Sequence, residues 1–292
     1  MCDSDNHQGY IVDTSFTRRS VVLAISSAAA AAALPGTAFA ADVTETDVIV
    51  PTPDGSADAV LFHPGGKGSW PAVLMWPDIL GLRPVFREMG RRLAGAGYTV
   101  LVPNPFYRTK RAPIVTGPFD FNDKAAVAPL LELKATLTDS RVDRDATAFI
   151  SFLDKQRQTN KRKGAGVQGY CFSGPFAFHT GAARSDRIRA VATFHGGGLV
   201  TKDPNSPHLL IPKTKAHFVV SIARNDDQKQ PEAKDVLKAA FASAKRPATV
   251  EVYPADHGWC VAGGGTYNEA AAEKAWAELL KLYRATLSLK AF

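Results

Sequence analysis

The chain has 292 residues, of which 45% are hydrophobic and 22% are charged, and its formal net charge is +7. Without the first 40 residues, 292 − 40 = 252 residues remain, which is enough for one large domain with a buried core and requires no second domain. The basic residues are scattered, and the tightest cluster, 161–163, precedes an expected strand with no nucleic-acid-binding motif near it. The charge therefore gives no support for a nucleic-acid partner.

Residues 1–40 have the pattern of a secretory leader. An arginine pair at 18–19 precedes an alanine-rich apolar run over 21–33, and small residues stand at the positions up to Ala40 that a signal peptidase reads. The pair indicates the twin-arginine (Tat) route, so we expect the Tat translocase as a partner during export and a periplasmic or extracellular location. The apolar run is shorter than the roughly 20 residues that span a bilayer. We therefore expect cleavage after Ala40, no stable membrane anchor afterwards, and one mature domain, 41–292.

Cysteine is sparse. Cys2 belongs to the leader, so the mature chain would contain only Cys171 and Cys260. Two cysteines make no disulfide framework, and neither stands in a CxxC or Cys/His spacing that would hold zinc. We therefore expect no metal and no cofactor.

Apolar runs of strand length alternate with amphipathic runs of helical length along most of the chain. The first two expected strands, 44–50 and 57–63, flank a turn and predict a hairpin at a sheet edge. From 103 to 140 the alternation breaks, and this proline-bearing segment is either a short cap over a pocket or a loop with short helices. The other expected strands are 71–76, 98–102, 166–170, 188–194, 217–223 and 249–253, and the expected helices are 84–94, 141–155, 175–183, 231–244 and 268–287.

This alternation predicts an α/β fold with a mainly parallel sheet and helices on both of its faces. In such sheets, functional residues gather at the carboxyl ends of the strands. The residues directly after each expected strand are therefore the candidates for a site.

One expected strand turns sharply into a helix around Cys171. The sequence there is Gly169-Tyr170-Cys171-Phe172-Ser173, with small residues two positions before and two after the cysteine. Such a turn strains its central residue and exposes its side chain, so it is typical of a nucleophile. Two other interpretations stay open. Cys171 could be a buried structural cysteine, and Ser173 could be the nucleophile, although it lacks a glycine two residues before it.

A cysteine nucleophile needs a base and an acid that holds the base. Asp226 and His257 each follow a later expected strand, so the chain order is nucleophile, acid, histidine, as in the α/β-hydrolase arrangement. Asp227 competes with Asp226 as the acid. His195, which also follows a strand, competes with His257 as the base.

The reaction also needs hydrogen-bond donors where negative charge develops on oxygen. The N–H of Phe172, at the start of the elbow helix, is the first candidate. The second is expected in the loop after the strand 71–76, where Pro77 has no N–H and Ile79 is the better candidate.

Four stretches together make the sequence similar to the dienelactone hydrolases. They are 169–171, 78–81 (Asp-Ile-Leu-Gly), 103–108 (Pro-Asn-Pro-Phe-Tyr-Arg) and 253–259 (Tyr-Pro-Ala-Asp-His-Gly-Trp), and the resemblance covers nearly all of the mature chain. It implies an α/β-hydrolase fold and hydrolysis of a small-molecule lactone or ester of an unsaturated acid through a thioester. Carried over by position, it implies that Cys171 is the nucleophile, His257 the base and Asp226 the orienting acid.

The resemblance implies further roles around this triad. Asp78 stands where the family has an acidic residue that helps to turn the thiol into a thiolate when substrate binds. Tyr107, Arg108, His195 and Trp259 are expected as possible residues of the substrate pocket.

The sequence departs from the family pattern at two places. Ser173 replaces the first of two paired glycines after the cysteine, and serine is small enough for the turn. The type enzyme also binds its substrate's carboxylate with arginines, one of them shortly after the catalytic histidine, whereas no arginine follows His257 closely here.

A second class of function is a redox-regulated or non-catalytic binding protein on a hydrolase fold. Cys260 lies three residues after His257, so a disulfide between Cys171 and Cys260 in an oxidising compartment would block or regulate the thiol.

Overall fold

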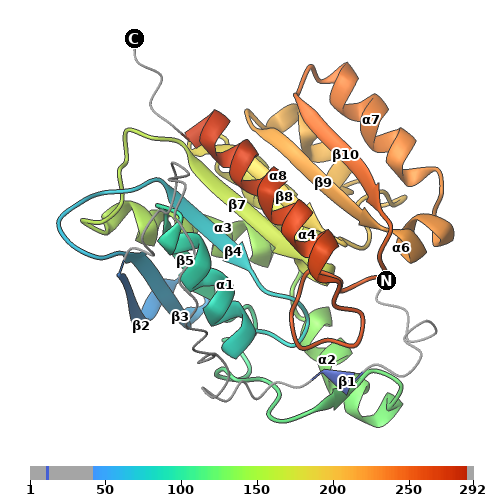
Figure 1. Ribbon diagram of the computed structural model, residues 1–292, viewed down its shortest axis with the longest axis horizontal. Helices are drawn as coiled ribbons and strands as arrows, with labels where there is room; N and C mark the ends of the chain where they lie inside the picture. Colours follow the sequence, from blue (N-terminus) through green and yellow to red (C-terminus); the bar gives the residue numbers. More distant parts are fainter. Residues whose placement is uncertain (1–10, 13–41, 288–292) are drawn as a thin grey trace, which may run out of the picture.

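The computed structural model describes residues 11–12 and 42–287, and an eight-stranded sheet runs through it (Figure 1). The strand order is β10-β9-β8-β7-β4-β5-β3-β2. The neighbours from β10 to β5 pair in parallel, whereas β3 pairs antiparallel with both β5 and β2. The predicted α/β fold with a mainly parallel sheet is therefore confirmed.

The strands lie close to their predicted positions. β2 (Val43–Thr52) and β3 (Gly55–Pro64) form the predicted edge hairpin. Every residue of the central strands β4 and β5 is buried, as expected for apolar strands covered on both faces. The parallel strands are β4 (Ala72–Trp76), β5 (Thr99–Pro103), β7 (Ala165–Tyr170), β8 (Ile188–Phe194), β9 (His217–Ala223) and β10 (Ala248–Tyr253).

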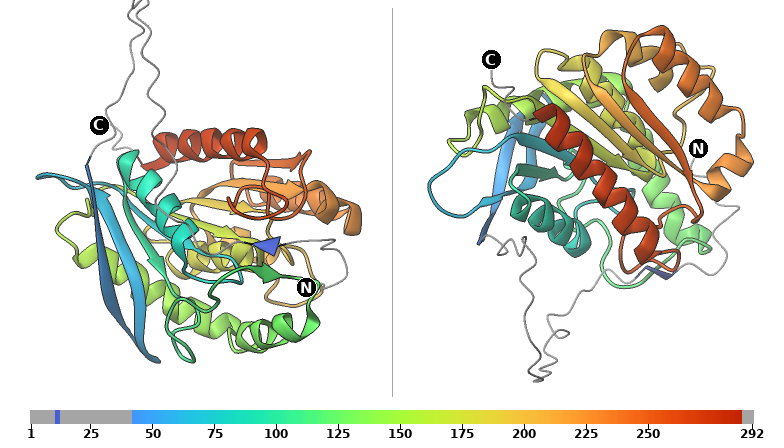
Figure 2. Two further views of the ribbon diagram at one scale, coloured as in Figure 1. Left: turned by 60° about the horizontal axis from the view of Figure 1, so that its bottom comes forward. Right: turned by 45° about the horizontal axis from the view of Figure 1, so that its top comes forward.

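Helices cover both faces of the sheet (Figures 1 and 2). On one face lie α1 (Pro84–Gly95) and α8 (Glu269–Leu287), and on the other lie α3 (Asp139–Lys155), α4 (Gly174–Ala183) and α7 (Ala233–Ser243). α1 begins at a proline, where a missing N–H leaves no hydrogen bond unmade, and its apolar side chains face the sheet. None of the helices within 42–287 is long and apolar enough to cross a membrane.

The predicted cap segment lies between β5 and α3. It contains the short strand β6 (Phe119–Asp120) and the helix α2 (Lys124–Ala135). β6 pairs antiparallel with β1 (Ile11–Val12), which falls within the predicted leader. The rest of that leader, together with its arginine pair and its cleavage site, lies outside the described residues.

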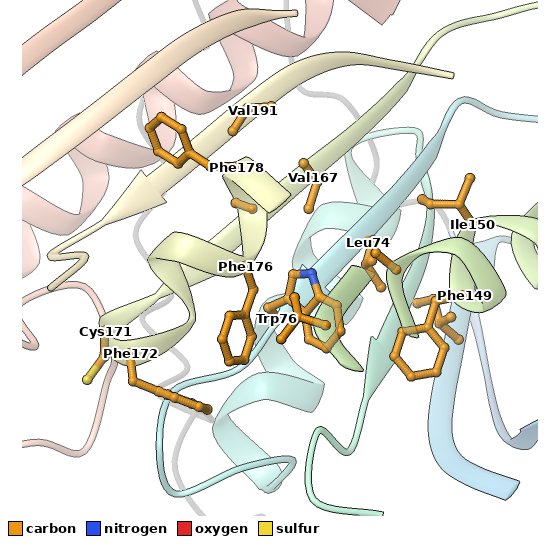
Figure 3. Packing of buried hydrophobic residues seen from close by; sticks show 14 of the residues in the cluster. Leu74, Trp76, Phe149, Ile150, Val167, Cys171, Phe172, Phe176, Phe178 and Val191 are labelled. Carbon is orange, nitrogen blue, oxygen red and sulfur yellow. The ribbon is translucent and has the colours of Figure 1, made fainter. Parts of the chain in front are cut away.

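The apolar cluster between the sheet, α3 and α4 reaches the carboxyl end of β7. Trp76 packs edge-to-face against Phe149 and Phe176, with ring centroids 5.4 and 5.5 Å apart. The Trp76 indole N–H also donates to Thr180 Oγ1 at 3.1 Å. Figure 3 shows Cys171 at the end of this cluster, with its sulfur turned away from the aromatic rings. The packing thus anchors the elbow while its thiol stays at the edge of the core.

Candidate active site

β7 ends in the turn that was predicted to carry a nucleophile. Cys171 begins a short 3₁₀ segment, and its φ of +56° lies in the left-handed region that residues other than glycine rarely adopt. A Cβ on Gly169 would lie 2.2 Å from the carbonyl oxygen of Ser173, and one on Gly174 would lie 2.6 Å from the Cα of Gly196. Glycine is required at both places because the backbones approach so closely.

Ser173 is more deeply buried than Cys171, which is 8% exposed. The Ser173 side chain is fully buried. Its Oγ accepts a hydrogen bond from the backbone N–H of Tyr170 at 2.9 Å and lies 3.0 Å from the carbonyl oxygen of Trp76. A hydroxyl enclosed by backbone groups has no open side toward a substrate, which argues against Ser173 as the nucleophile.

The structure brings Asp226 and His257 together at the carboxyl edge of the sheet. Asp226 lies in the first turn of the short helix α6 (Arg224–Lys229), and its Oδ2 is 2.6 Å from Nδ1 of His257. The preceding strands, β9 and β10, are parallel neighbours, so the residues that follow them meet at one edge. The backbone N–H of His257 donates to Asn225 Oδ1 at 2.8 Å, and Thr266 Oγ1 donates to the His257 carbonyl at 2.7 Å. The two backbone bonds hold the loop that carries His257, and the contact with Asp226 holds its imidazole ring.

The competing carboxylate, Asp227, is bound elsewhere: Lys234 Nζ lies 2.8 Å from it. Asp256, directly before His257, pairs with Arg224 at 3.0 Å. No helix was expected directly after β9, but the chain forms α6 there. Within this helix the adjacent Asp226 and Asp227 point in different directions, so only the first reaches the histidine.

His195 lies against His257 instead of taking its place. It has a φ of +41° and is 1% exposed, and its ring centroid is 4.7 Å from that of His257. Neither of its ring nitrogens has a hydrogen-bond partner among the described residues. Burial, and secondly the charge that His257 can carry, hold the pKa of His195 well below its usual value. The buried imidazole is therefore neutral.

Trp259 extends this layer of rings. It is fully buried, its ring centroid is 5.2 Å from that of His195, and it stacks on Tyr253 with a centroid distance of 5.0 Å. Trp259 and His195 are both buried, and their predicted place in the lining of a substrate pocket stays a prediction. They support His257 from the side of the core.

Tyr107 and Arg108 belong to a network within the protein. The guanidinium of Arg108 is 2.7 Å from Asp54 and 2.7 Å from the buried Asp145, and the Tyr107 hydroxyl donates to Asp145 at 2.8 Å. Burial is the main cause of the raised pKa of Asp145, and Arg108 opposes that shift. Two carboxylates of the chain itself thus balance the charge of Arg108. That these two side chains also face a substrate stays a prediction.

An arginine that sequence reasoning missed holds Asp78. Both oxygens of Asp78 bind the guanidinium of Arg83, at 2.6 and 2.9 Å, and Asp78 Oδ1 also accepts from the N–H of Leu80 at 3.0 Å. The side chain of Arg83, directly before α1, is 1% exposed. Arginine is rarely so buried unless it is paired. The available signal was the position of Arg83 between an apolar loop and an apolar helix, close to an acidic residue.

The two candidate oxyanion donors follow neighbouring strands. β4 and β7 are parallel, with Trp76 paired to Gly169, and Ile79 and Phe172 stand shortly after the ends of these strands. The Phe172 ring stacks on Phe106 with a centroid distance of 5.7 Å and an interplanar angle of 9°. Both backbone positions therefore lie at the edge of the sheet that carries Cys171.

Neither of the two cysteines of the described residues, Cys171 and Cys260, is part of a disulfide. Cys171 packs in the core on the α3–α4 side of the sheet, whereas Cys260 packs against the core on the α1–α8 side and lines a cavity of about 280 Å³ there. Burial raises the pKa of Cys260 well above its usual value. The structure thus contains no disulfide between them.

Within 42–287, no group of three or more His, Cys, Asp or Glu side chains could hold a metal ion.

Comparisons with known proteins find similarity to the same group of hydrolases over most of the chain. The model of the dienelactone hydrolase family matches residues 57–287. Carboxymethylenebutenolidase of Rhodococcus opacus is 27% identical over 243 residues, which cover 82% of this chain and 90% of the relative. Carboxymethylenebutenolidase 1 of Cupriavidus pinatubonensis is 27% identical over 219 residues, covering 73% and 86%. A Klebsiella pneumoniae structure assigned as a dienelactone hydrolase is similar with a TM-score of 0.72 at 21% identity, covering 83% of this chain and 99% of the other.

A strained elbow after a central parallel strand, with an acid and a histidine after later strands, defines an α/β-hydrolase. The family model that matches residues 57–287 describes one family within this class. The chain belongs to the dienelactone hydrolase family, and it is a hydrolase that acts on ester or lactone bonds.

Proposed function

We propose that this enzyme hydrolyses a small carboxylic ester or lactone with Cys171 as nucleophile, His257 as base and Asp226 as the acid that orients the base. The observation that carries the proposal is the 2.6 Å contact between His257 Nδ1 and Asp226 Oδ2, at the sheet edge where the strained Cys171 leaves β7. Asp226 keeps the proton on Nδ1, so Nε2 is the nitrogen that takes the thiol proton.

The reaction proceeds in two halves. The Cys171 thiolate attacks the carbonyl carbon, and the electron pair of the C=O bond moves onto oxygen, where the N–H groups of Ile79 and Phe172 stabilise it. The C–O bond to the leaving group breaks, the leaving oxygen takes the proton from His257, and a thioester remains. Water then gives a proton to His257 and attacks the thioester, and the thiolate leaves as the acid product forms.

Asp78 is the proposed thiol-activating carboxylate. In the structure both of its oxygens bind Arg83, so the pair is a resting arrangement. Activation requires the carboxylate to leave the guanidinium, turn toward Cys171 and pass the thiol proton on to His257. The Arg83 pair therefore sets how readily the thiolate forms.

The proposal is tested by hydrolysis of a small aryl ester, followed by release of the phenol. Cys171→Ala is expected to lower turnover by roughly 10³-fold or more, because no other side chain replaces the nucleophile. Cys260→Ala removes the other thiol and is expected to keep the wild-type rate, since that side chain lies on the other side of the sheet. Mass spectrometry of enzyme quenched during turnover should find the acyl group on the peptide that contains Cys171. Undiminished turnover in Cys171→Ala would refute the proposal.

A further inference from the structure

The hydroxyl of Ser173 stands between the ends of two neighbouring strands. It accepts from the N–H of Tyr170, the last residue of β7, at 2.9 Å, and its Oγ lies 3.0 Å from the carbonyl oxygen of Trp76, the last residue of β4. Parallel strands ordinarily join such an N–H and such a carbonyl directly. Here a side-chain hydroxyl links them, at the point where both strands leave the sheet.

The single proton of this hydroxyl has two acceptors within reach. The Trp76 carbonyl oxygen is 3.0 Å from Oγ and the Tyr170 carbonyl oxygen is 2.9 Å from it. The bond to Tyr170 stays within the elbow, whereas the bond to Trp76 ties the elbow to β4. Because the Ser173 side chain is fully buried, water does not replace either bond freely.

The two segments joined by this hydroxyl are those that carry the candidate oxyanion donors. After Trp76 the chain enters Pro77, which has no N–H, and reaches Ile79 two residues later. After Tyr170 it enters Cys171 and Phe172. The link through Ser173 thus lies just before both donor positions. It also lies where a proline prevents the backbone from continuing the ladder.

We infer that Ser173 is a positioning residue that fixes the spacing between the N–H groups of Ile79 and Phe172. The inference rests on the proposed ester or lactone hydrolysis, in which these two groups form the oxyanion hole. Preorganised donors stabilise the developing oxyanion only if their spacing is held before the reaction begins. The glycine that is typical of the family at this position has no hydroxyl, so this chain holds the spacing with a contact of its own.

The kinetic test compares Ser173→Ala with Thr180→Val. Thr180 is a matched control: it lies on α4, is fully buried, and its hydroxyl also contacts Trp76, but through the indole N–H at 3.1 Å instead of the backbone. Loss of a whole oxyanion donor lowers kcat about 10²–10³-fold, and a displaced donor retains part of its effect. We therefore expect Ser173→Ala to lower kcat about tenfold, with KM within about twofold of wild type. Thr180→Val should keep kcat within about twofold.

A transition-state mimic distinguishes a change in the spacing of the donors from an unspecific disturbance of the structure. A trifluoromethyl ketone adds the Cys171 thiolate to its carbonyl carbon and places an oxyanion at the donors. Its affinity should fall in Ser173→Ala by about the factor lost in kcat, because both report the same spacing. A wild-type kcat in Ser173→Ala, or an equal loss in Thr180→Val, would overturn the inference.

Amide hydrogen exchange provides a readout that needs no turnover. In Ser173→Ala the amide of Tyr170, which donates to Ser173 Oγ, should exchange at least about tenfold faster than in wild type, while Thr180→Val leaves it unchanged. Unchanged exchange at Tyr170 would overturn the inference even if Cys171 is the nucleophile. Conversely, full turnover in Cys171→Ala would refute the proposed function, while faster exchange in Ser173→Ala would still support the link between β4 and the elbow.

Discussion

Replacement of His195 by asparagine is expected to make the protein less sensitive to acid. The imidazole is 1% exposed, and burial holds its pKa well below the usual value in the folded protein. In the unfolded chain the same side chain takes up a proton near pH 6.5. The unfolded state therefore binds more protons than the folded state below that pH, and His195 lowers the stability of the wild type as the pH falls.

The size of the effect follows from this difference in proton binding. A histidine that stays neutral in the folded protein, and takes up a proton near pH 6.5 in the unfolded chain, lowers the free energy of unfolding by about 1.4 kcal/mol between pH 7.5 and pH 5.5. Asparagine does not titrate in this range, and it tolerates the left-handed φ of +41° better than most residues. His195→Asn should thus lose about 1.4 kcal/mol less than the wild type over these two pH units.

Urea unfolding at pH 7.5, 6.5 and 5.5 measures this difference. Any loss of ring packing in His195→Asn lowers its stability at all three pH values, so the comparison uses the change with pH and not the absolute stability. His217→Asn is the control, because that side chain is exposed and stays in water in both states. Parallel pH dependences of wild type and His195→Asn would refute the reasoning, since they would mean that the buried ring takes up a proton in the folded protein.

Two further substitutions test the charged residues of the site. Arg83→Met leaves the buried Asp78 carboxylate without its partner and should lower the free energy of unfolding by about 3–5 kcal/mol in urea titrations. Arg87→Met breaks partly exposed pairs between α1 and β2 and should lower the free energy of unfolding by at most about 1 kcal/mol. Equal losses in the two variants would contradict this account. Asp226→Asn should lower kcat on an aryl ester by roughly 10²–10⁴-fold because the histidine loses its orienting charge. Asp227→Asn should leave kcat unchanged. A wild-type rate in Asp226→Asn would exclude Asp226 as the acid.

The parts of the site that the sequence predicted are those that depend on local pattern and chain order. Gly169 and Cys171 could be identified because a strand-to-helix turn needs small residues at set positions. Asp226 and His257 could be identified because parallel strands bring the residues after them to one edge. The helix α6 was missed because six residues are too few to show a helical period.

The contacts that the sequence did not predict join side chains that are distant in the sequence. Arg108 pairs with Asp54 and Asp145, which lie 54 and 37 residues away from it. No spacing rule connects such positions, and an arginine in a cap segment can equally face a substrate or a carboxylate of its own chain. The same holds for Trp259, whose place against His195 depends on how β8 and β10 end in three dimensions.

The pair between Asp78 and Arg83 makes the loop after β4 neutral by itself, because both charges lie within the stretch 78–83. The loop after His257 therefore does not need to supply a positive charge to pair with Asp78. Residues around Cys260 could be exchanged to change the shape of the cavity that Cys260 lines without leaving a buried carboxylate unpaired. In this chain, the segment that holds the base and the segment that balances the acidic residue are independent units for redesign.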